Sequence, residues 1–344
     1  MTVVARGAQK TKAPILAVVA IVAIGFLPMG CNEAEEVASN NDAGTEGLVF
    51  TRHYHTATGA YETITVTYEV THFMGFSNAV IIPAYYNEHP VARIGNRVFE
   101  GNQLTRVAIP DTITSIGDLA FVGNRLTSVA IPYGVTSIGR SAFERNQLAD
   151  IDIPKSVTSI GTLAFANNRL SNIDIPNGIA RIERLTFSNN RITNVTIPGG
   201  VTYIGEGAFA SNRIASVTIP NGVTHIGQRA FENNQLASVV IPNSVTLIGQ
   251  SAFERNQLIS ATIGTSVTSI GDRAFAQNQL TNISIPGSVA AVGRWAFAWN
   301  PTLETIRIPF ASREIADRVW RTGWRSDVSV AVVVINNAGV PVTH

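Results

Sequence analysis

The amino-acid sequence predicts a repeat solenoid, mainly β, with a parallel sheet on its concave face and an irregular or short helical convex side. Three observations lead to this prediction. A phenylalanine recurs every 22 residues at ten positions, and an asparagine follows each one three residues later. A short strand pattern ending in proline occupies a fixed place in nearly every unit. Repetition at a constant period of this length is typical of solenoids and arrays.

The repeated phenylalanines are expected to form the core. A single 22-residue coil cannot bury its own apolar edge, so it must stack on its neighbours. At the usual strand spacing of about 4.8 Å, each ring then packs on the rings above and below it. The positions are Phe99, Phe121, Phe143, Phe165, Phe187, Phe209, Phe231, Phe253, Phe275 and Phe297.

The repeated asparagines are expected to satisfy the main chain at a tight corner. Their side chains carry both a donor and an acceptor, and we expect each to bond to the corner and to the next asparagine, forming a ladder. A row of ligand-binding amides is the alternative. The positions are Asn102, Asn124, Asn146, Asn168, Asn190, Asn212, Asn234, Asn256, Asn278 and Asn300.

The unit from Leu126 to Gln147 illustrates the remaining limbs of a coil. Val129 to Ile131 alternates like a strand, and Pro132 should end it because proline has no N–H for a ladder. The second half, rich in β-branched residues, suits an irregular or short extended limb with at most one helical turn. A glycine recurs there, either for a positive φ or for a close backbone approach. Glu183 replaces that glycine in one coil.

These motifs together resemble a known family. The segments "LTSVAIP", "GVTSIG" and "AF", in this order and spacing, are similar to the BspA-like leucine-rich repeats of bacterial surface proteins. The likeness covers about residues 48–309, although this unit is one residue shorter than the commoner 23-residue form. The resemblance implies a leucine-rich-repeat solenoid and attachment to extracellular-matrix proteins. Its motif is specific for fold and weakly specific for function, because the matched residues are core residues.

The N-terminal segment is predicted to direct export. Residues 1–30 hold three basic residues, no acid and an apolar run from Ile15 to Leu27, which is too short to cross a bilayer comfortably. Cys31, the only cysteine, follows in "LPMGC", which resembles a bacterial lipoprotein signal. We therefore expect Cys31 to be lipid-modified, although Pro28 departs from the usual pattern; an ordinary cleaved signal is the alternative. Residues 31–47, acidic and small, should form a flexible tether.

Charge excludes two classes of partner. Without the signal, the chain holds 22 basic and 24 acidic residues, so its net charge gives no footprint for nucleic acid. Lys155 is then the only lysine, which excludes polybasic attraction to anionic lipid. We expect contact with a membrane only through a lipid anchor.

Both ends of the solenoid need covering. Residues 48–90 should form a β cap and the first coil, and residues 91–309 the ten-repeat solenoid. Residues 310–344 should form the C-terminal cap, beginning with an amphipathic helix that carries Ile315, Val319 and Trp320 on one side and stops at Gly323. All four tryptophans, which lie between residues 295 and 324, are expected to cluster over the open coil end; an aromatic ligand pocket is the alternative.

The strand positions that vary between repeats are the candidate binding face. Their side chains should point outward, and they are mostly small, hydroxyl-bearing or amide-bearing, with acids in the middle and arginine at both ends. The candidates are Arg106, Asp150, Asp152, Asn172, Asp174, Asn194, Thr196, Thr218 and Arg307. One hypothesis is a surface-anchored adhesion protein whose partner is an extracellular protein or glycan of a host or neighbouring cell. The other is a structural envelope protein, a rigid spacer with no dedicated ligand.

Enzymatic chemistry is not expected. The chain has no nucleophile elbow, phosphate loop or metal-ligand set, and we expect no cofactor. His53 and His55 lie on one face of a predicted strand and could form half of a metal site, but no third ligand is evident. The carboxylates Asp150, Asp152 and Asp174 should face solvent, without the burial that acid/base work needs.

Overall fold

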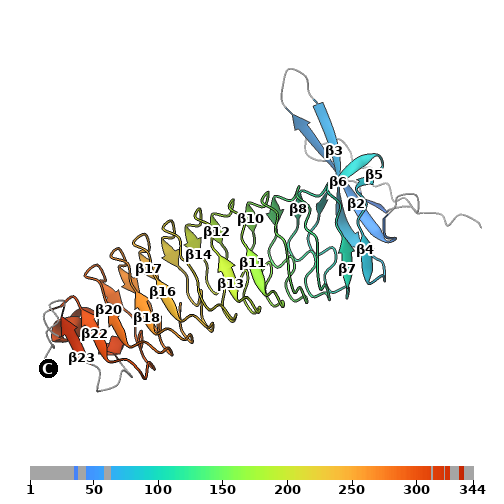
Figure 1. Ribbon diagram of the computed structural model, residues 1–344. Helices are drawn as coiled ribbons and strands as arrows, with labels where there is room; N and C mark the ends of the chain where they lie inside the picture. Colours follow the sequence, from blue (N-terminus) through green and yellow to red (C-terminus); the bar gives the residue numbers. More distant parts are fainter. Residues whose placement is uncertain are drawn as a thin grey trace, which may run out of the picture.

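The computed structural model is an elongated stack of coils with a cap at each end (Figure 1). It describes residues 35–37, 44–57, 63–310, 313–320, 322–325 and 333–336. The predicted signal, Cys31 and most of the predicted tether lie outside these residues. No helix among the described residues has the length and apolarity needed to span a bilayer. The predicted fold class, a β solenoid with a β cap and a short helical cap, is confirmed.

The N-terminal cap is built from strands that pair with the first coil. β2 (Leu48–Ala57) and β3 (Thr63–Phe73) form an antiparallel hairpin that projects from the stack. β3 then pairs in parallel with β6 (His89–Ile94), which β5 (Tyr85–Tyr86) joins from the other side. β1 (Glu35–Val37) pairs with β2, so part of the predicted flexible tether forms a strand.

Each coil has two limbs that can carry a short strand, although the first limb has no strand at residues 128–130, 150–152 and 216–218. In the first, here called limb A, the middle residue is mostly buried and its two neighbours are exposed, as the alternation predicts. The strands of limb A are β4 (Ala79–Ile81), β7 (Arg106–Ala108), β11 (Asn172–Asp174), β13 (Asn194–Thr196), β16 (Ser238–Val240), β18 (Ser260–Thr262), β20 (Asn282–Ser284) and β22 (Thr305–Ile308).

The second limb, here called limb B, forms the longer ladders although its strands have only two residues each. These strands are β8 (Ser115–Ile116), β9 (Ser137–Ile138), β10 (Ser159–Ile160), β12 (Arg181–Ile182), β14 (Tyr203–Ile204), β15 (His225–Ile226), β17 (Leu247–Ile248), β19 (Ser269–Ile270) and β21 (Ala291–Val292). They join into two runs, β6-β8-β9-β10 and β12-β14-β15-β17-β19-β21. Limb A, where we expected the continuous sheet, is instead divided into short sheets.

The third limb, which carries the phenylalanines, bonds to the following coil without forming a regular strand. The N–H groups of Leu119, Phe121 and Gly123 donate to carbonyls of the next coil at 2.7–2.9 Å. Leu119 and Gly123 have positive φ values of 57° and 69°. The equivalent residues of the other coils share this conformation, among them Leu163 and Asn167. A non-glycine residue held there costs roughly 1–2 kcal/mol, which the stacked neighbours must offset.

The phenylalanines form the predicted column. Centroids of successive rings from Phe99 to Phe297 lie 5.1–5.8 Å apart, with planes within 14° of parallel. Every ring is at most 1% exposed. Phe73 of the N-terminal cap lies against Phe99 at 5.5 Å and covers that end of the column. Burial and ring stacking therefore act together along the whole stack.

The recurring glycine of limb B serves a close backbone approach. A Cβ at Gly139 or Gly205 would lie 2.5–2.7 Å from the main chain of the preceding coil. None of the glycines at this position has a positive φ, so the other sequence interpretation is wrong. Glu183 does carry a Cβ here, and the limb B sheet is interrupted between β10 and β12, at this coil. We attribute the interruption to that side chain.

The helix of the C-terminal cap buries only part of the side that carries Ile315, Val319 and Trp320. α1 (Arg313–Trp320) buries Ala316 and Trp320, whereas Ile315 and Val319 are 39% and 47% exposed. Trp320 and Trp324, the latter in the 3₁₀ turn Thr322–Arg325, pack edge to face at 5.4 Å. Trp320 Nε1 donates to the Val289 carbonyl at 3.1 Å, which anchors the cap to the last coils. β23 (Val333–Asn336) pairs with β22.

The other two tryptophans lie outside this cluster. The guanidinium of Arg273 lies 5.0 Å from the Trp295 ring centre and 5.8 Å from that of Trp299. Trp299 is 43% exposed. Both have positive φ, because they occupy the two left-handed positions of the third limb. Among the described residues no ring contact joins this pair to Trp320 or Trp324, although the Trp295 N–H donates to the Gly323 carbonyl of the cap at 2.9 Å.

Removing one ring from the column should destabilise the stack. Phe231→Ala leaves a cavity between Phe209 and Phe253, and we expect it to lower the free energy of unfolding by about 3–5 kcal/mol. Urea unfolding followed by circular dichroism measures the loss. Tyr133→Ala is the matched control, since Tyr133 is 81% exposed. Equal effects of the two variants would contradict the role of the column.

Restoring the missing glycine should repair the limb B ladder. Glu183→Gly removes the intruding Cβ and lets β10 pair with β12. Each hydrogen bond formed there should stabilise the fold by about 0.5–1.5 kcal/mol. Together these bonds should exceed the conformational-entropy cost of the added glycine, about 0.5–1 kcal/mol. We expect a higher urea midpoint and slower amide exchange around Ile182. The reverse change, Gly227→Glu, should lower the midpoint. A lower midpoint for Glu183→Gly would contradict the explanation.

Candidate functional site

The candidate binding residues lie on limb A of successive coils. Arg106, Asp150, Asp152, Asn172, Asp174, Asn194, Thr196 and Thr218 are exposed, and Arg307 is partly buried. They belong to limb A, and their outward side chains form what we call the limb A face. Where strands form, the register aligns equivalent positions of successive coils, as Asn172 with Asn194 and Asp174 with Thr196.

The structure brings the acidic candidates together and separates the arginines. Asp150 and Asp152 lie one coil before Asp174, because the main chain at Ser171 bonds to Ala149 of the preceding coil, whereas Arg106 begins β7 and Arg307 lies in β22. Within the described part of the chain, no salt bridge neutralises Asp150, Asp152 or Asp174. One oxygen of Asp150 accepts a hydrogen bond from the Ile151 N–H at 3.0 Å. The three carboxylates thus form an acidic area open to solvent.

The asparagine ladder connects coils through the main chain. The Leu104 N–H donates to Asn124 Oδ1 at 2.8 Å, and Asn124 Nδ2 donates to the carbonyls of Phe99 and Phe121 at 2.6 and 3.0 Å. Every later asparagine of the column repeats this pattern. Asn102, in the first coil, contacts the Phe99 and Glu100 carbonyls.

This geometry corrects one detail of the prediction. The asparagines do satisfy the corner, but the main chain of the preceding coil takes the place of the expected asparagine partner. From Asn124 to Asn300 they are at most 8% exposed. Their amides are therefore occupied within the fold, and the row of ligand-binding amides is not supported.

The two histidines of the N-terminal cap contact other side chains and do not converge on one point as metal ligands would. His53 Nε2 lies 3.2 Å from Glu69 Oε2, and His55 Nε2 lies 2.9 Å from Thr67 Oγ1. His55 is exposed at the edge of the hairpin. Among the residues that the structure describes, no group of three metal-ligating side chains comes together.

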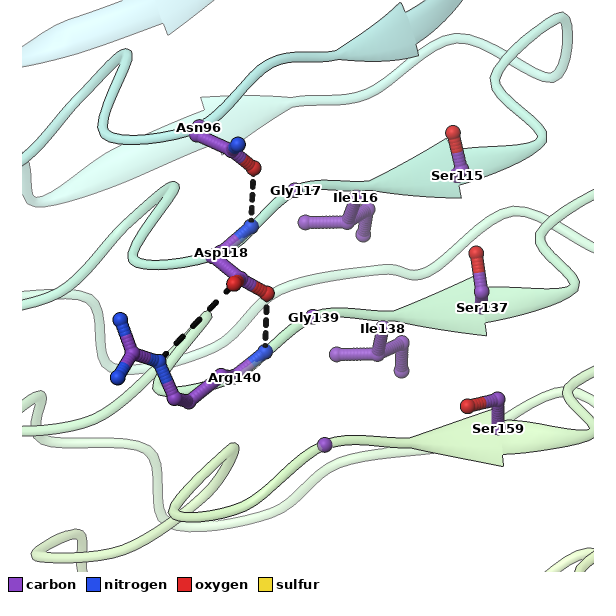
Figure 2. A pocket seen from close by; sticks show the side chains of 11 residues that line it. Asn96, Ser115, Ile116, Gly117, Asp118, Ser137, Ile138, Gly139, Arg140 and Ser159 are labelled. Atoms are coloured by element: carbon purple, nitrogen blue, oxygen red, sulfur yellow. Dashed lines mark hydrogen bonds and ion pairs between the residues drawn. The ribbon is translucent and has the colours of Figure 1, made fainter.

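Limb B carries a shallow hollow that the sequence analysis did not identify. It has a volume of about 440 Å³ and a floor formed by serines and glycines, including Ser137 and Gly139 (Figure 2). At its rim, Asn96 Oδ1 accepts from the Asp118 N–H, and Asp118 Oδ1 accepts from the Arg140 N–H, each at 2.7 Å. These polar groups are thus already paired with one another. The sequence pattern that could have predicted this hollow is the Ser-Ile-Gly that recurs in limb B.

Other charged groups lie away from the limb A face. Burial raises the pKa of the Glu232 carboxyl, and the neighbouring Glu254 raises it further, while Arg229 and Arg255 act against this. Glu232 is in the third limb, 3.6 Å from Arg229. On limb B, the Arg181 guanidinium lies 4.0 Å over the Tyr203 ring and within 3.3 Å of Glu183.

Similar solved structures include three bacterial proteins. A leucine-rich cell surface protein from Faecalibacterium prausnitzii is 26% identical, with 82% of this chain and 95% of that chain covered and a TM-score of 0.44. The pneumococcal vaccine antigen PcpA is 17% identical, with coverage of 88% and 99% and a TM-score of 0.46. A leucine-rich repeat protein from Eubacterium ventriosum is 18% identical, with coverage of 83% and 84% and a TM-score of 0.43.

The repeat region of a known protein family matches most of the solenoid. A search of curated proteins finds no match. The BspA type leucine-rich repeat region matches residues 92–215 and 202–322, with six copies of its repeat. These ranges contain the phenylalanine column and the asparagine ladder described above. The chain therefore belongs to the BspA type leucine-rich repeat family.

Proposed function

We propose that this protein is a non-enzymatic, surface-anchored binding protein that recognises an extracellular protein or glycan through the limb A face. The observation that carries the proposal is the group of exposed carboxylates Asp150, Asp152 and Asp174, which lack salt-bridge partners among the described residues. Repeat proteins present extended surfaces of this kind to macromolecular partners. Exposed carboxylates favour a partner segment that carries basic groups or hydrogen-bond donors.

The composition of the face supports recognition by polar contacts. Around the carboxylates lie Asn172, Asn194, Thr196 and Thr218, all exposed. Amides, hydroxyls and carboxylates can bind both protein main chain and sugar hydroxyls. Because neighbouring coils hold these groups in register, a partner can contact several coils at once.

The predicted lipid anchor at Cys31 would hold this face outside the cell membrane. Residues 1–30 have the pattern of an export signal, and the lone cysteine follows it directly. The outer surface is the location that suits an adhesion protein, and the periplasm is the alternative. Both lie outside the membrane, so the anchor alone does not separate them.

A rigid spacer of the cell envelope is the second candidate function. The observation that favours it is the number of parallel contacts between coils: limb B ladders, third-limb hydrogen bonds, stacked rings and asparagines. Such a stack resists bending. A spacer needs no ligand, so changes on the limb A face would leave its role intact.

Removing the acidic area should weaken partner capture. We expect the triple variant Asp150→Ser, Asp152→Ser, Asp174→Ser to retain about a tenth or less of the binding to extracellular-matrix and salivary proteins, since desolvated charge pairs typically cost 2–5 kcal/mol when broken. A pull-down followed by binding titration measures it. The matched control, Thr262→Ser with Asn282→Ser, exchanges exposed neutral groups on the same face that are not among the candidates. Unchanged capture by the aspartate variant would exclude this face.

Accessibility on living cells separates the two candidate functions. An adhesion protein must reach its partner, so we expect protease added to intact cells to degrade the solenoid. A periplasmic spacer would be degraded only after the outer membrane is permeabilised. Immunoblotting measures how much of the chain is degraded, and a periplasmic protein that stays intact shows that the outer membrane was not broken. Protection on intact cells would favour the spacer.

A further inference from the structure

A strip of three arginines runs along the corner that holds the asparagine ladder. Arg169, Arg191 and Arg213 occupy the same position in three successive coils, each directly after a ladder asparagine. The Arg191 N–H donates to the Leu170 carbonyl and the Arg213 N–H to the Ile192 carbonyl, both at 2.9 Å. These hydrogen bonds hold the three residues in register. We call Arg169, Arg191 and Arg213 the arginine strip.

The strip is exposed and has no acidic partner among the described residues. All three side chains are exposed, and none is part of a salt bridge, whereas Arg97, Arg145, Arg181, Arg184 and Arg229 each lie within 4.0 Å of a carboxylate. The residues on either side of the strip are neutral. They are Asn167, Asn189 and Ser211 on one side and Ser171, Thr193 and Ala215 on the other.

The spacing of the strip suits a chain of anionic groups. Successive coils are separated by about the distance between their stacked rings, 5.8 Å for Phe165–Phe187 and 5.6 Å for Phe187–Phe209. Like charges at this spacing repel one another, and bound anions relieve that repulsion. Each guanidinium can hold a sulfate or phosphate group through two parallel hydrogen bonds. A small anion meets one arginine, but a polymer meets all three, and its later contacts form at high effective concentration.

We propose that the arginine strip binds a linear polyanion carrying sulfate or phosphate groups. The strip consists of other residues than the limb A face, and its charge preference is the opposite. The net charge of the chain does not predict it, because the acids that balance these arginines lie elsewhere in the coils. Among the described residues none of these arginines lies over an aromatic ring on which a base could also stack, which disfavours single-stranded nucleic acid.

The repeats supply a substitution that leaves the fold intact. Gln147 and Gln235 occupy the strip position in the two flanking coils, and their N–H groups make the same hydrogen bond at 2.9 and 3.0 Å. Glutamine therefore fits this corner. The test compares the full chain with the triple variant Arg169→Gln, Arg191→Gln, Arg213→Gln, using dextran sulfate and polyphosphate as probes and neutral dextran as the blank.

We expect the parent chain to bind at least one anionic probe and the triple variant to bind it about tenfold or more weakly. The slope of log affinity against log salt should fall by about two, since each such contact contributes roughly 0.7–0.9. Gln235→Arg, which extends the strip, should tighten binding about twofold or more. Preference for dextran sulfate indicates a sulfated glycan, and preference for polyphosphate a phosphate polymer.

Two controls make the test specific. Arg184→Gln removes an arginine that is paired with Glu206 at 3.2 Å, and it should leave binding unchanged. The limb A triple variant at Asp150, Asp152 and Asp174 should bind the polyanion as well as the parent or better, so failure of this proposal is distinguishable from failure of the proposed adhesion function. Equal binding by parent and arginine variant would overturn the proposal, as would tighter binding of single-stranded DNA than of either probe.

Discussion

The constant length of the coil is the constraint on which the rest of the structure depends. Because every unit has 22 residues from Phe99 to Phe297, equivalent groups of successive coils meet without a shift in register. Ring stacking, asparagine bonding and main-chain ladders all require that alignment. A one-residue insertion within the stack would move a phenylalanine away from its neighbours and expose an asparagine. Pro301, the one added residue, comes after the last phenylalanine and the last asparagine of the stack, where it disturbs neither column.

The asparagine pairs the buried main-chain groups of each coil, and the phenylalanine supplies its buried apolar surface. A tight corner leaves main-chain groups pointing inward, and burying them unpaired costs about 1–3 kcal/mol each. Asn168 accepts from the Leu148 N–H and donates to the Phe143 and Phe165 carbonyls, so it satisfies three such groups. With the corner satisfied, the rings can pack against a dry interior. Hydrogen bonding and apolar burial are thus coupled in every coil.

Strict repetition made the interior predictable, and departures from it were harder to interpret. The phenylalanine column and the corner asparagines follow from period and residue chemistry. Whether glycine gives a positive φ or close approach depends on the distance between coils, which Gly139 reveals only in three dimensions. In α1, Ala316 is buried instead of Ile315, because docking of Trp320 sets the rotation of the helix. The different surroundings of Trp320 and Trp299 likewise depend on the three-dimensional structure, because one lies in α1 and the other in the third limb of the last coil.

A solenoid separates the residues that hold it together from those that contact other molecules. The strip position illustrates this, since some coils have glutamine there and others arginine, while Asn146, Asn168 and the hydrogen bonds beside them stay the same. Substitution at such positions changes charge along the rod without changing packing. Net charge, summed over the chain, cannot detect the result, because an acidic area around Asp152 and a basic strip around Arg191 cancel in the total. Charge in a repeat protein is therefore better assessed one position at a time along the stack.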